Sequence, residues 1–295
     1  MGTSFIITVY SDSSQKAEKA VREAFNEIKR IESELNIYNN NSELSRLNTS
    51  KILEAPSESI KINIERSLYY SNLSNGAFDI TVQPILDLFK ESFRERKSPP
   101  SDEMIKKELI KVNYKEVIIK DKQIKIGSNQ RLTLGGIAKG YAVEKAVEVL
   151  KKYEISSAIV DASGNMRALG RKPEGTWNIA IKNPRDENNY ITIIPLDNNA
   201  VSTSGDYERY FNESKTFHHI INPKTGYSAT ELISVTIVTD NAFDADVLST
   251  TVFVLGKEKG MKLIESLPNV EGLIITSDRK IIISSGFKET NTDKK

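Results

Sequence analysis

The chain has no cysteine among its 295 residues and only two histidines. The absence of cysteine excludes disulfide bonds, thiolate ligands and a lipidated cysteine within this sequence. No run of 18 apolar residues is present, and the N-terminus lacks the basic and apolar segments of a signal peptide. The sequence therefore predicts neither a membrane-spanning helix nor an export signal, and it leaves open that export is encoded in a segment removed from it.

Net charge is also nearly absent, since 41 Lys and Arg residues face 40 Asp and Glu residues and leave +1. A nucleic-acid-binding surface usually carries a clear positive excess, so no nucleic-acid partner is predicted. The charged fraction of 27% and the hydrophobic fraction of 38% are typical of a globular protein with a sizeable core. No linker rich in Gly, Ser or Pro divides the chain, which favours a single domain over residues 1–288 and a disordered tail over 289–295.

Strand patterns outnumber helix patterns, and several strands follow one another as pairs. This arrangement predicts an α+β fold, with a largely antiparallel or mixed sheet flanked by helices. Helices are expected from about residue 13 to 35 and at 60–75, 101–112, 137–153, 242–255 and 257–267. Strands are expected at 4–10, 76–82, 131–134, 156–161, 176–184, 190–196, 233–240, 272–277 and 280–285, with a hairpin over 114–127.

The two histidines, His218 and His219, stand side by side before a Pro-Lys-Thr-Gly turn at 223–226. Imidazole changes its charge near neutral pH, so this pair is the main candidate for proton chemistry, with His219 in first place. The alternative is a strand end whose imidazoles bond to backbone carbonyl groups, and spacing alone favours that structural alternative.

Asp246 and Thr250 are four residues apart in a helical pattern, so they share one face of the helix. A carboxylate beside a hydroxyl is a hard-oxygen pair of the kind that Mg²⁺ or Ca²⁺ accepts, whereas the plain alternative is a helix N-cap. Gly135 and Gly136 precede another predicted helix, where free amide groups and Lys139 could bind a phosphate. The glycine pair matches no phosphate-binding motif, and a tight turn explains it more often.

Six segments, taken in order over almost the whole chain, resemble the ApbE family of FAD:protein FMN transferases. They read MGTSFIITVY, YNNNSELSRLN, GAFDITVQPILDLF, LTLGGIAKGYAVEKA, VSTSGDYERYF with HHIINPKTG, and ADVLSTTVFVLG. The resemblance implies an ApbE-like fold and an enzyme that cuts FAD with the help of Mg²⁺. Such an enzyme transfers FMN to a Thr or Ser hydroxyl of an acceptor protein and releases AMP.

Two other functions stay open beside that one. Some ApbE-like proteins are thought mainly to hydrolyse FAD, so the nearest alternative is an FAD pyrophosphatase that uses water as acceptor. An alternative of another class is a flavin-binding protein without catalysis. The resemblance also implies an extracytoplasmic domain at the cell surface, held to the membrane through an N-terminal anchor that is missing from this chain.

The resemblance further implies roles for individual residues. His219 matches the family's proposed catalytic base. Asp246 and Thr250 match its metal-binding pair, with the backbone carbonyl of Ala138 as a third ligand. The segments that line the flavin and adenine pocket contain Tyr38, Asp79, Lys139, Glu144, Thr203 and Gly205.

The chain departs from the family pattern at four positions. Thr133 stands where an Asp is usual, and Glu144 and Asn222 stand where an Asp is frequent. Ser163 stands where a glycine is common. These departures leave His219, Asp246 and Thr250 untouched, so activity is expected to survive them.

Overall fold

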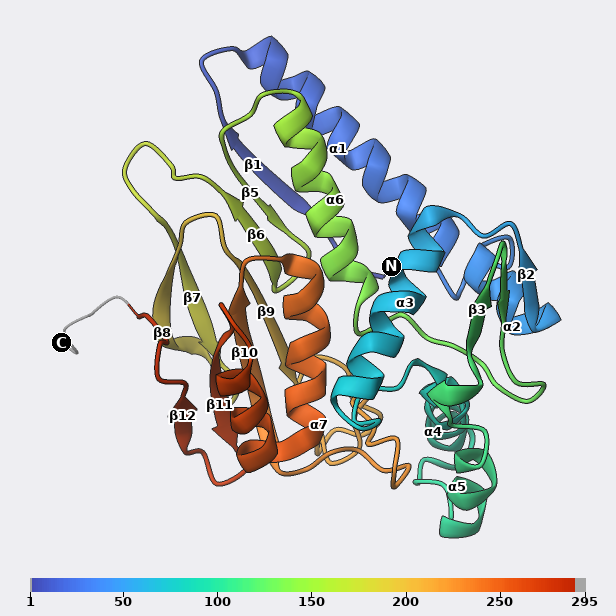
Figure 1. Ribbon diagram of the computed structural model, residues 1–295. Coiled ribbons are helices and arrows are strands. Elements are labelled where there is room, and N and C mark those ends of the chain that lie inside the picture. Colours follow the sequence, from blue (N-terminus) through green and yellow to red (C-terminus); the bar gives the residue numbers. More distant parts are fainter. Residues whose placement is uncertain (1, 290–295) are drawn as a thin grey trace.

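A seven-stranded sheet forms the centre of the molecule in the computed structural model, which describes residues 2–289 (Figure 1). Each strand is antiparallel to its neighbours, which confirms the expected α+β class. In spatial order the strands are β1 (Ile6–Tyr10), β5 (Ser157–Asp161), β6 (Asn165–Leu169), β9 (Ala200–Gly205), β10 (Leu232–Thr239), β11 (Glu271–Thr276) and β12 (Ile281–Ile283).

Three helices cover one face of this sheet: α1 (Ser14–Leu35), α6 (Ala138–Lys152) and α7 (Ala242–Ser266) (Figure 1). Helix α7 is interrupted at Gly256, whose φ of 79° lies in the left-handed region that favours glycine. This break separates the two helices expected at 242–255 and 257–267. The buried side of α1 consists of residues three, four or seven apart, namely Ala20, Ala24, Ile28, Ile31 and Leu35, as its amphipathic pattern predicts.

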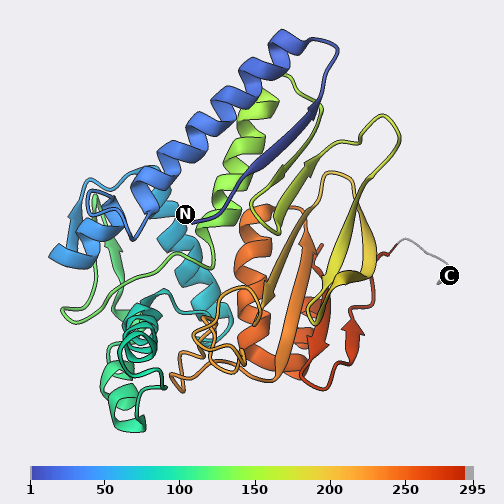
Figure 2. The ribbon, with the colours of Figure 1, turned by 180° about the vertical axis from the view of Figure 1, so that it is seen from behind.

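The opposite face of the sheet is covered by a hairpin of β7 (Trp177–Asn183) and β8 (Asp186–Leu196), seen from behind in Figure 2. This hairpin confirms the expected pairing of the segments 176–184 and 190–196. Its buried apolar residues form a second core with residues of β6 and β9, and this core contains Ala168, Trp177, Ile181, Ile194, Leu196 and Val201.

The remaining elements lie beside the large sheet at one end of the molecule (Figure 1). They are α2 (Glu43–Ser50), α3 (Glu58–Leu73), α4 (Gln83–Arg96), α5 (Asp102–Leu109), the 3₁₀ turns η1 (Ile80–Val82) and η2 (Tyr114–Glu116), and a small sheet of β2 (Ile52–Glu54), β4 (Gln123–Lys125) and β3 (Ile118–Lys120). Strands β3 and β4 confirm the expected hairpin over 114–127, with Asp121 in its turn at a φ of 53°.

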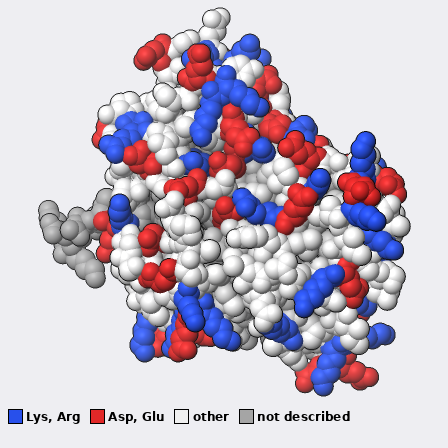
Figure 3. Space-filling view, in the orientation of Figure 1, with Lys and Arg blue, Asp and Glu red and all other residues white. Residues whose placement is uncertain are grey.

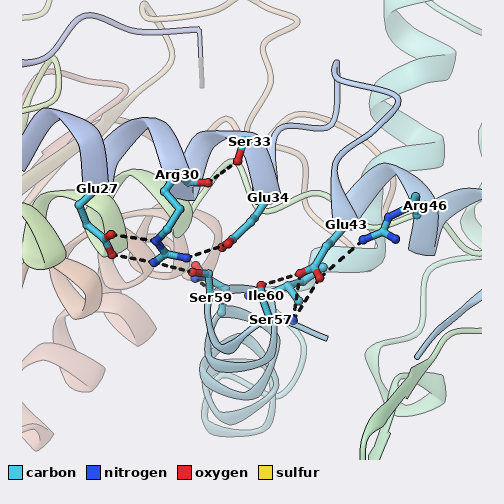
Figure 4. Close-up of polar contacts among 10 residues, drawn as sticks. Glu27, Arg30, Ser33, Glu34, Glu43, Arg46, Ser57, Ser59 and Ile60 are labelled. Atoms are coloured by element: carbon cyan, nitrogen blue, oxygen red, sulfur yellow. Dashed lines mark hydrogen bonds and ion pairs between the residues drawn. The ribbon is translucent and has the colours of Figure 1, made fainter. Parts of the chain in front are cut away.

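Charged side chains of α1 and α2 bond to the start of α3 (Figure 4). Arg30 pairs with Glu27 and Glu34 on its own helix α1, at 2.6 and 2.7 Å, and donates a hydrogen bond to the Ser59 hydroxyl on α3 at 3.3 Å. Glu43, the first residue of α2, accepts a hydrogen bond from the amide of Ser57 at 3.1 Å, and Ser57 is the N-cap of α3. A carboxylate on one helix therefore holds the start of the next, because the first amides of a helix have no partner within it.

Two expected strands are wrong. Residues 76–82 form no strand, because the Asp79 carboxylate accepts the Thr81 amide at 2.8 Å and caps the 3₁₀ turn η1 instead. Residues 131–134 form no strand either, since the side chain of Asn48 bonds to the main chain that a partner strand would pair with. Its Oδ1 accepts from the Leu132 amide at 2.6 Å and its Nδ2 donates to the Leu132 carbonyl at 2.9 Å.

The charged residues of the surface show no separation by sign on the face that Figure 3 presents. Lys and Arg are interspersed with Asp and Glu over the face shown in Figure 3. Within residues 2–289, no helix is long and apolar enough to cross a membrane. The expected tail was placed at 289–295, but the Glu289 carboxylate accepts a hydrogen bond from Thr192 at 2.7 Å; residues 290–295 lie outside the described part of the chain.

Candidate active site

A cavity of about 370 Å³ lies between the start of α6, the end of β9, helix α4 and the segment 206–223. Its volume falls within the range typical of small-molecule sites. Elements that are far apart in the sequence supply its wall, so only the folded chain forms it. Eight of the ten residues that the resemblance assigns to the site line the cavity, namely Tyr38, Asp79, Ala138, Lys139, Thr203, Gly205, His219 and Thr250.

Asp246 lies immediately behind the cavity wall, where helices α6 and α7 cross closely. Its exposure is 2%, and its Oδ2 accepts a hydrogen bond from the Gly140 amide near the start of α6 at 2.9 Å. A Cβ atom on Gly140 would lie 2.2 Å from the Ala242 carbonyl oxygen and 2.7 Å from the Asp246 Cβ. Glycine at this position therefore allows α7 to bring the carboxylate against the positive end of α6.

The second oxygen of Asp246 is covered by two side chains that do line the cavity. The Lys139 ammonium lies 3.3 Å from Asp246 Oδ1 and forms a largely buried ion pair with it. Asn165, at the start of β6, is 3% exposed. Its amide nitrogen donates to Asp246 Oδ1 at 2.8 Å, and its amide oxygen accepts from Lys139 Nζ at 3.2 Å, in the orientation that satisfies both groups.

A chain of hydroxyl groups connects this cluster to Thr250. Ser202 lies 2.6 Å from the Asn165 amide and 3.2 Å from the Ser249 hydroxyl. Ser204 then joins Ser249 at 2.8 Å and Thr250 at 3.3 Å. Ser249 also donates to the main-chain carbonyl of Asp246 at 2.9 Å. The predicted metal-binding pair is thus held in one polar network between α7, β6 and β9.

The adjacent histidines have different environments. The ring of His218 is 2% exposed; its Nε2 donates to the Ala229 carbonyl at 2.9 Å, and its Nδ1 accepts from the Ile220 amide at 3.3 Å. Both nitrogens are therefore used inside the protein, which is the structural role that spacing alone favoured. His219, by contrast, lines the cavity.

The tautomer of His219 follows from the hydrogen bond between its ring and the main chain. Its Nδ1 lies 2.9 Å from the Arg209 carbonyl oxygen, which can only accept, so Nδ1 carries the proton and Nε2 carries the lone pair. Burial lowers the pKa of His219 to about 4, against the weaker opposing effect of the Arg209 carbonyl. At neutral pH the ring is therefore uncharged and able to accept a proton at Nε2.

Comparison with known proteins supplies the identification. The model of the ApbE family matches residues 1–274. This chain belongs to the ApbE family. Curated relatives named FAD:protein FMN transferase include those of Treponema pallidum, 30% identical over 97% of this chain and 85% of the relative, and Haemophilus influenzae, 31% identical over 100% of this chain and 90% of the relative.

Solved structures show the same fold. The ApbE protein of Thermotoga maritima is 32% identical and superposes with a TM-score of 0.88, over 96% of this chain and 94% of that protein. The flavin transferase ApbE of Vibrio cholerae is 26% identical and reaches 0.83, over 97% of this chain and 95% of that protein. The ApbE-like fold expected from the sequence is therefore confirmed.

Most of the predicted pocket residues have a structural partner as well as a place in the ApbE cavity wall. Both carboxylate oxygens of Asp79 accept backbone amides, from Thr81 and Tyr114, and burial raises the pKa of Asp79 against these bonds. The Thr203 hydroxyl bonds to that of Thr236 at 2.9 Å. Asp79 therefore shapes the wall mainly by organising the backbone.

Two further wall residues, Tyr38 and Gly205, differ in how closely the surrounding residues pack against them. Tyr38 is 74% exposed at the rim, where its ring lies beneath the Lys90 ammonium at 5.4 Å. Gly205 ends β9, and a Cβ atom there would lie 2.3 Å from the ring of Tyr207. The predicted cofactor contacts of these residues stay predictions.

Glu144 is the one predicted pocket residue that lies outside the cavity wall altogether. Its carboxylate accepts the amide of Ala242, the first residue of α7, at 2.9 Å, and faces Arg167 at 3.4 Å. It therefore helps to hold the helix that carries Asp246, and its position does not support the expected flavin contact. A carboxylate at a helix start also stabilises the helix dipole.

Three departures from the ApbE pattern have local explanations. Thr133 accepts the Gly135 amide on its hydroxyl at 3.3 Å, and Asn222 accepts the Lys224 amide on its side chain at 2.9 Å, as an Asp could at either position. Ser163 has a φ of 51°, in the left-handed region, which explains why glycine is common there. Its hydroxyl bonds to that of Ser4 at 3.2 Å.

Sequence reasoning missed several residues of the site. Asn165 and the serines of the hydroxyl chain are ordinary strand and helix residues, and no motif in the sequence marks them. Arg209 acts through its main-chain carbonyl, which no sequence pattern reveals. Among residues 2–289, no group of three or more His, Cys, Asp and Glu side chains could hold a metal ion, so a metal site built on the Asp246 carboxylate needs hydroxyl, amide or carbonyl oxygens to complete it.

Proposed function

We propose that this chain is an FAD:protein FMN transferase that moves FMN from FAD onto a Thr or Ser hydroxyl of an acceptor protein and releases AMP. It is an enzyme of the ApbE family, whose curated relatives carry that transferase name. The observation that carries the proposal is that one cavity wall contains both Thr250 and a neutral His219 whose Nδ1 bonds to the Arg209 carbonyl, with Asp246 immediately behind that wall. Those groups come from segments that are separated in the sequence.

The oxygen donors fit a hard divalent cation. Asp246 offers a carboxylate, Thr250 a hydroxyl and Ala138 a main-chain carbonyl, and in this structure a cation already lies against Asp246, the Lys139 ammonium at 3.3 Å. These residues would hold Mg²⁺, which when bound polarises the pyrophosphate oxygens and offsets the charge of the leaving AMP. Thr250 and Lys139 line the cavity, so both can face a pyrophosphate there.

His219 provides the proton acceptor for the transfer. As the acceptor hydroxyl attacks the phosphorus of the FMN half, its proton passes to Nε2 of His219, and the bond from that phosphorus to the AMP oxygen breaks. The Arg209 carbonyl keeps the Nδ1 proton in place, so that Nε2 has its lone pair available when the acceptor hydroxyl gives up its proton. The proposed product is a phosphoester between FMN and the acceptor side chain.

The test combines a mass measurement with a nucleotide assay. The purified chain is incubated with FAD and Mg²⁺, with and without a candidate flavin-acceptor domain. Release of AMP together with a gain of one FMN in the acceptor mass is the expected result. Formation of AMP and free FMN regardless of acceptor would instead indicate the pyrophosphatase, and FAD that stays intact for hours in both tubes would indicate a flavin-binding protein.

The extracytoplasmic location and the N-terminal anchor stay proposals that rest on the resemblance. Fractionation of the source cells, with mass spectrometry of the N-terminus of the cellular protein, tests them. A processed or lipidated N-terminus in the envelope fraction is expected. An unprocessed protein in the cytosolic fraction would contradict this location without affecting the proposed chemistry.

A further inference from the structure

The access to Asp246 is blocked by the chain's own groups. Asp246 is 2% exposed and does not line the cavity, whereas Lys139 and Asn165 both line it. The Lys139 ammonium and the Asn165 amide nitrogen both lie against the same oxygen, Asp246 Oδ1. Any ion that reaches this oxygen from the cavity must therefore replace at least one of them.

The Lys139 ammonium neutralises a carboxylate that would otherwise be buried and uncompensated. A buried charge without a partner is strongly destabilising, so the ion pair suits a resting state in which no metal is bound. Lysine has a flexible four-carbon stem, and the Lys139 side chain is 23% exposed. The ammonium can therefore swing into the cavity while its Cα stays on α6.

The Asn165 amide can serve both states. With its nitrogen toward Asp246 it donates a hydrogen bond, as described above. Turned over, it accepts from the Ser202 hydroxyl at 2.6 Å, and its oxygen then faces Asp246 Oδ1 at 2.8 Å. Two acceptor oxygens at that distance repel one another unless a cation lies beside both, and the rotatable hydroxyl of Ser202 fits either orientation.

We propose that Lys139 and Asn165 are positioning residues that hold the Asp246–Thr250 pair in a metal-free resting state, and that a divalent cation enters by displacing the Lys139 ammonium while the Asn165 amide turns its oxygen toward the cation. The displaced ammonium then faces the anionic groups of a ligand in the cavity. This inference rests on the proposed function, because it takes the Asp246–Thr250 pair as the metal-binding pair.

The test measures the binding of Mg²⁺ alone, without flavin, by calorimetric titration of the full chain. Lys139→Met removes the competing ammonium and keeps most of the apolar stem, so its affinity for Mg²⁺ is expected to rise at least about tenfold. Lys90→Met is the matched control, since it removes a positive charge from the same cavity where the ammonium lies over the Tyr38 ring instead. Its affinity for Mg²⁺ is expected to change less than threefold.

Thermal unfolding gives a second readout, independent of activity. Lys139→Met should melt below the wild type without metal and regain more of its stability than the wild type when Mg²⁺ is added. Asn165→Asp places a second carboxylate beside Asp246, so it should also lower the melting temperature without metal and tighten Mg²⁺ binding. An unchanged affinity in Asn165→Asp would remove Asn165 from the proposal.

The outcomes distinguish a failure of the Lys139 displacement from a failure of the proposed transferase function. If the wild type binds Mg²⁺ and transfers FMN, but Lys139→Met binds Mg²⁺ no more tightly, the displacement is wrong and the proposed function stands. An equal gain in Lys90→Met would also overturn it, because the effect would then be one of general charge. If neither the wild type nor Lys139→Met binds Mg²⁺, the metal-binding pair itself is wrong.

Discussion

The two parts of the candidate site are built in opposite ways. The part that contains Asp246 lies where α6 crosses α7, and its polar groups are buried and hydrogen-bonded to one another. The part that contains His219 belongs to residues 206–231, which join β9 to β10 without a helix or strand of their own. Its strand-like pairing is confined to isolated bridges, such as that between Tyr210 and His218.

This contrast matches the different requirements of metal binding and of contact with an acceptor protein. A metal-binding group must keep its oxygens within a few tenths of an ångström of their places, which a close helix crossing provides. A group that meets the hydroxyl of a large acceptor benefits from a segment that can adjust to it, and long irregular segments often carry such functions. Substitutions at the crossing of α6 and α7 should therefore change Mg²⁺ binding, whereas substitutions in residues 206–231 should change the transfer rate or the stability without changing Mg²⁺ binding.

The largest effect is expected from Asp246→Ala. It removes the only carboxylate of the proposed metal site, and a loss of several kcal/mol of charge stabilisation corresponds to a fall of roughly 10³- to 10⁴-fold in the rate of FMN transfer. Asp244→Ala is the matched control on the same helix, because Asp244 pairs with Arg66 instead. Transfer rates and calorimetric Mg²⁺ binding are measured for both, and equal losses would contradict the assignment.

The adjacent histidines provide the sharpest comparison within the segment. His219→Ala should lower the transfer rate by about 10³-fold, in the middle of the range for general-base catalysis, with little change in unfolding. His218→Ala breaks internal hydrogen bonds to Ala229 and Ile220 and should cost about 1–3 kcal/mol of unfolding free energy. Stopped-time mass assays and urea unfolding test this, and wild-type transfer by His219→Ala would exclude His219 as the base.

A smaller effect is expected where the helices cross. Gly140→Ala inserts a Cβ atom 2.2 Å from the Ala242 carbonyl oxygen, so α6 and α7 must separate, at a cost of about 1–3 kcal/mol of unfolding free energy. Mg²⁺ binding should weaken with it. The control is Gly135→Ala, whose Cβ atom would meet only the Thr133 hydroxyl at 3.5 Å, and its melting temperature should match the wild type.

The last prediction concerns pH. Burial lowers the pKa of both histidines, that of His219 to about 4, while a histidine in the unfolded chain titrates near about 6.5. Between these values the unfolded chain binds protons that the folded protein does not, so the free energy of unfolding falls as pH drops from about 6.5 to 4. Urea unfolding should show a shallower fall for His219→Ala over this window, and identical curves would contradict the lowered pKa.

Much of the fold could be read from local patterns. The apolar spacing of α1, the hairpin of β3 and β4 and the two parts of α7 lie close to where the patterns predict them. The two wrong strands share one cause, since side chains took over hydrogen bonds that a strand partner would make. The Asp79 side chain bonds to the backbone of the adjacent turn η1. The Asn48 side chain bonds to the backbone of Leu132, 84 residues further along the chain.

The candidate site could also be predicted from the sequence only in part. The spacing of Asp246 and Thr250 on one helical face, the His pair and the ordered family segments are properties of the sequence by itself, because helical periodicity and residue chemistry are local. Which histidine is buried, that Glu144 lies behind the wall, and that Asn165 and Lys139 cover Asp246 were decided only by the tertiary structure. The physical reason is that hydrogen bonds and ion pairs depend on distances between elements far apart in the chain. Lys139 and Asp246, for example, are 107 residues apart, and only packing brings the ammonium within 3.3 Å of the carboxylate.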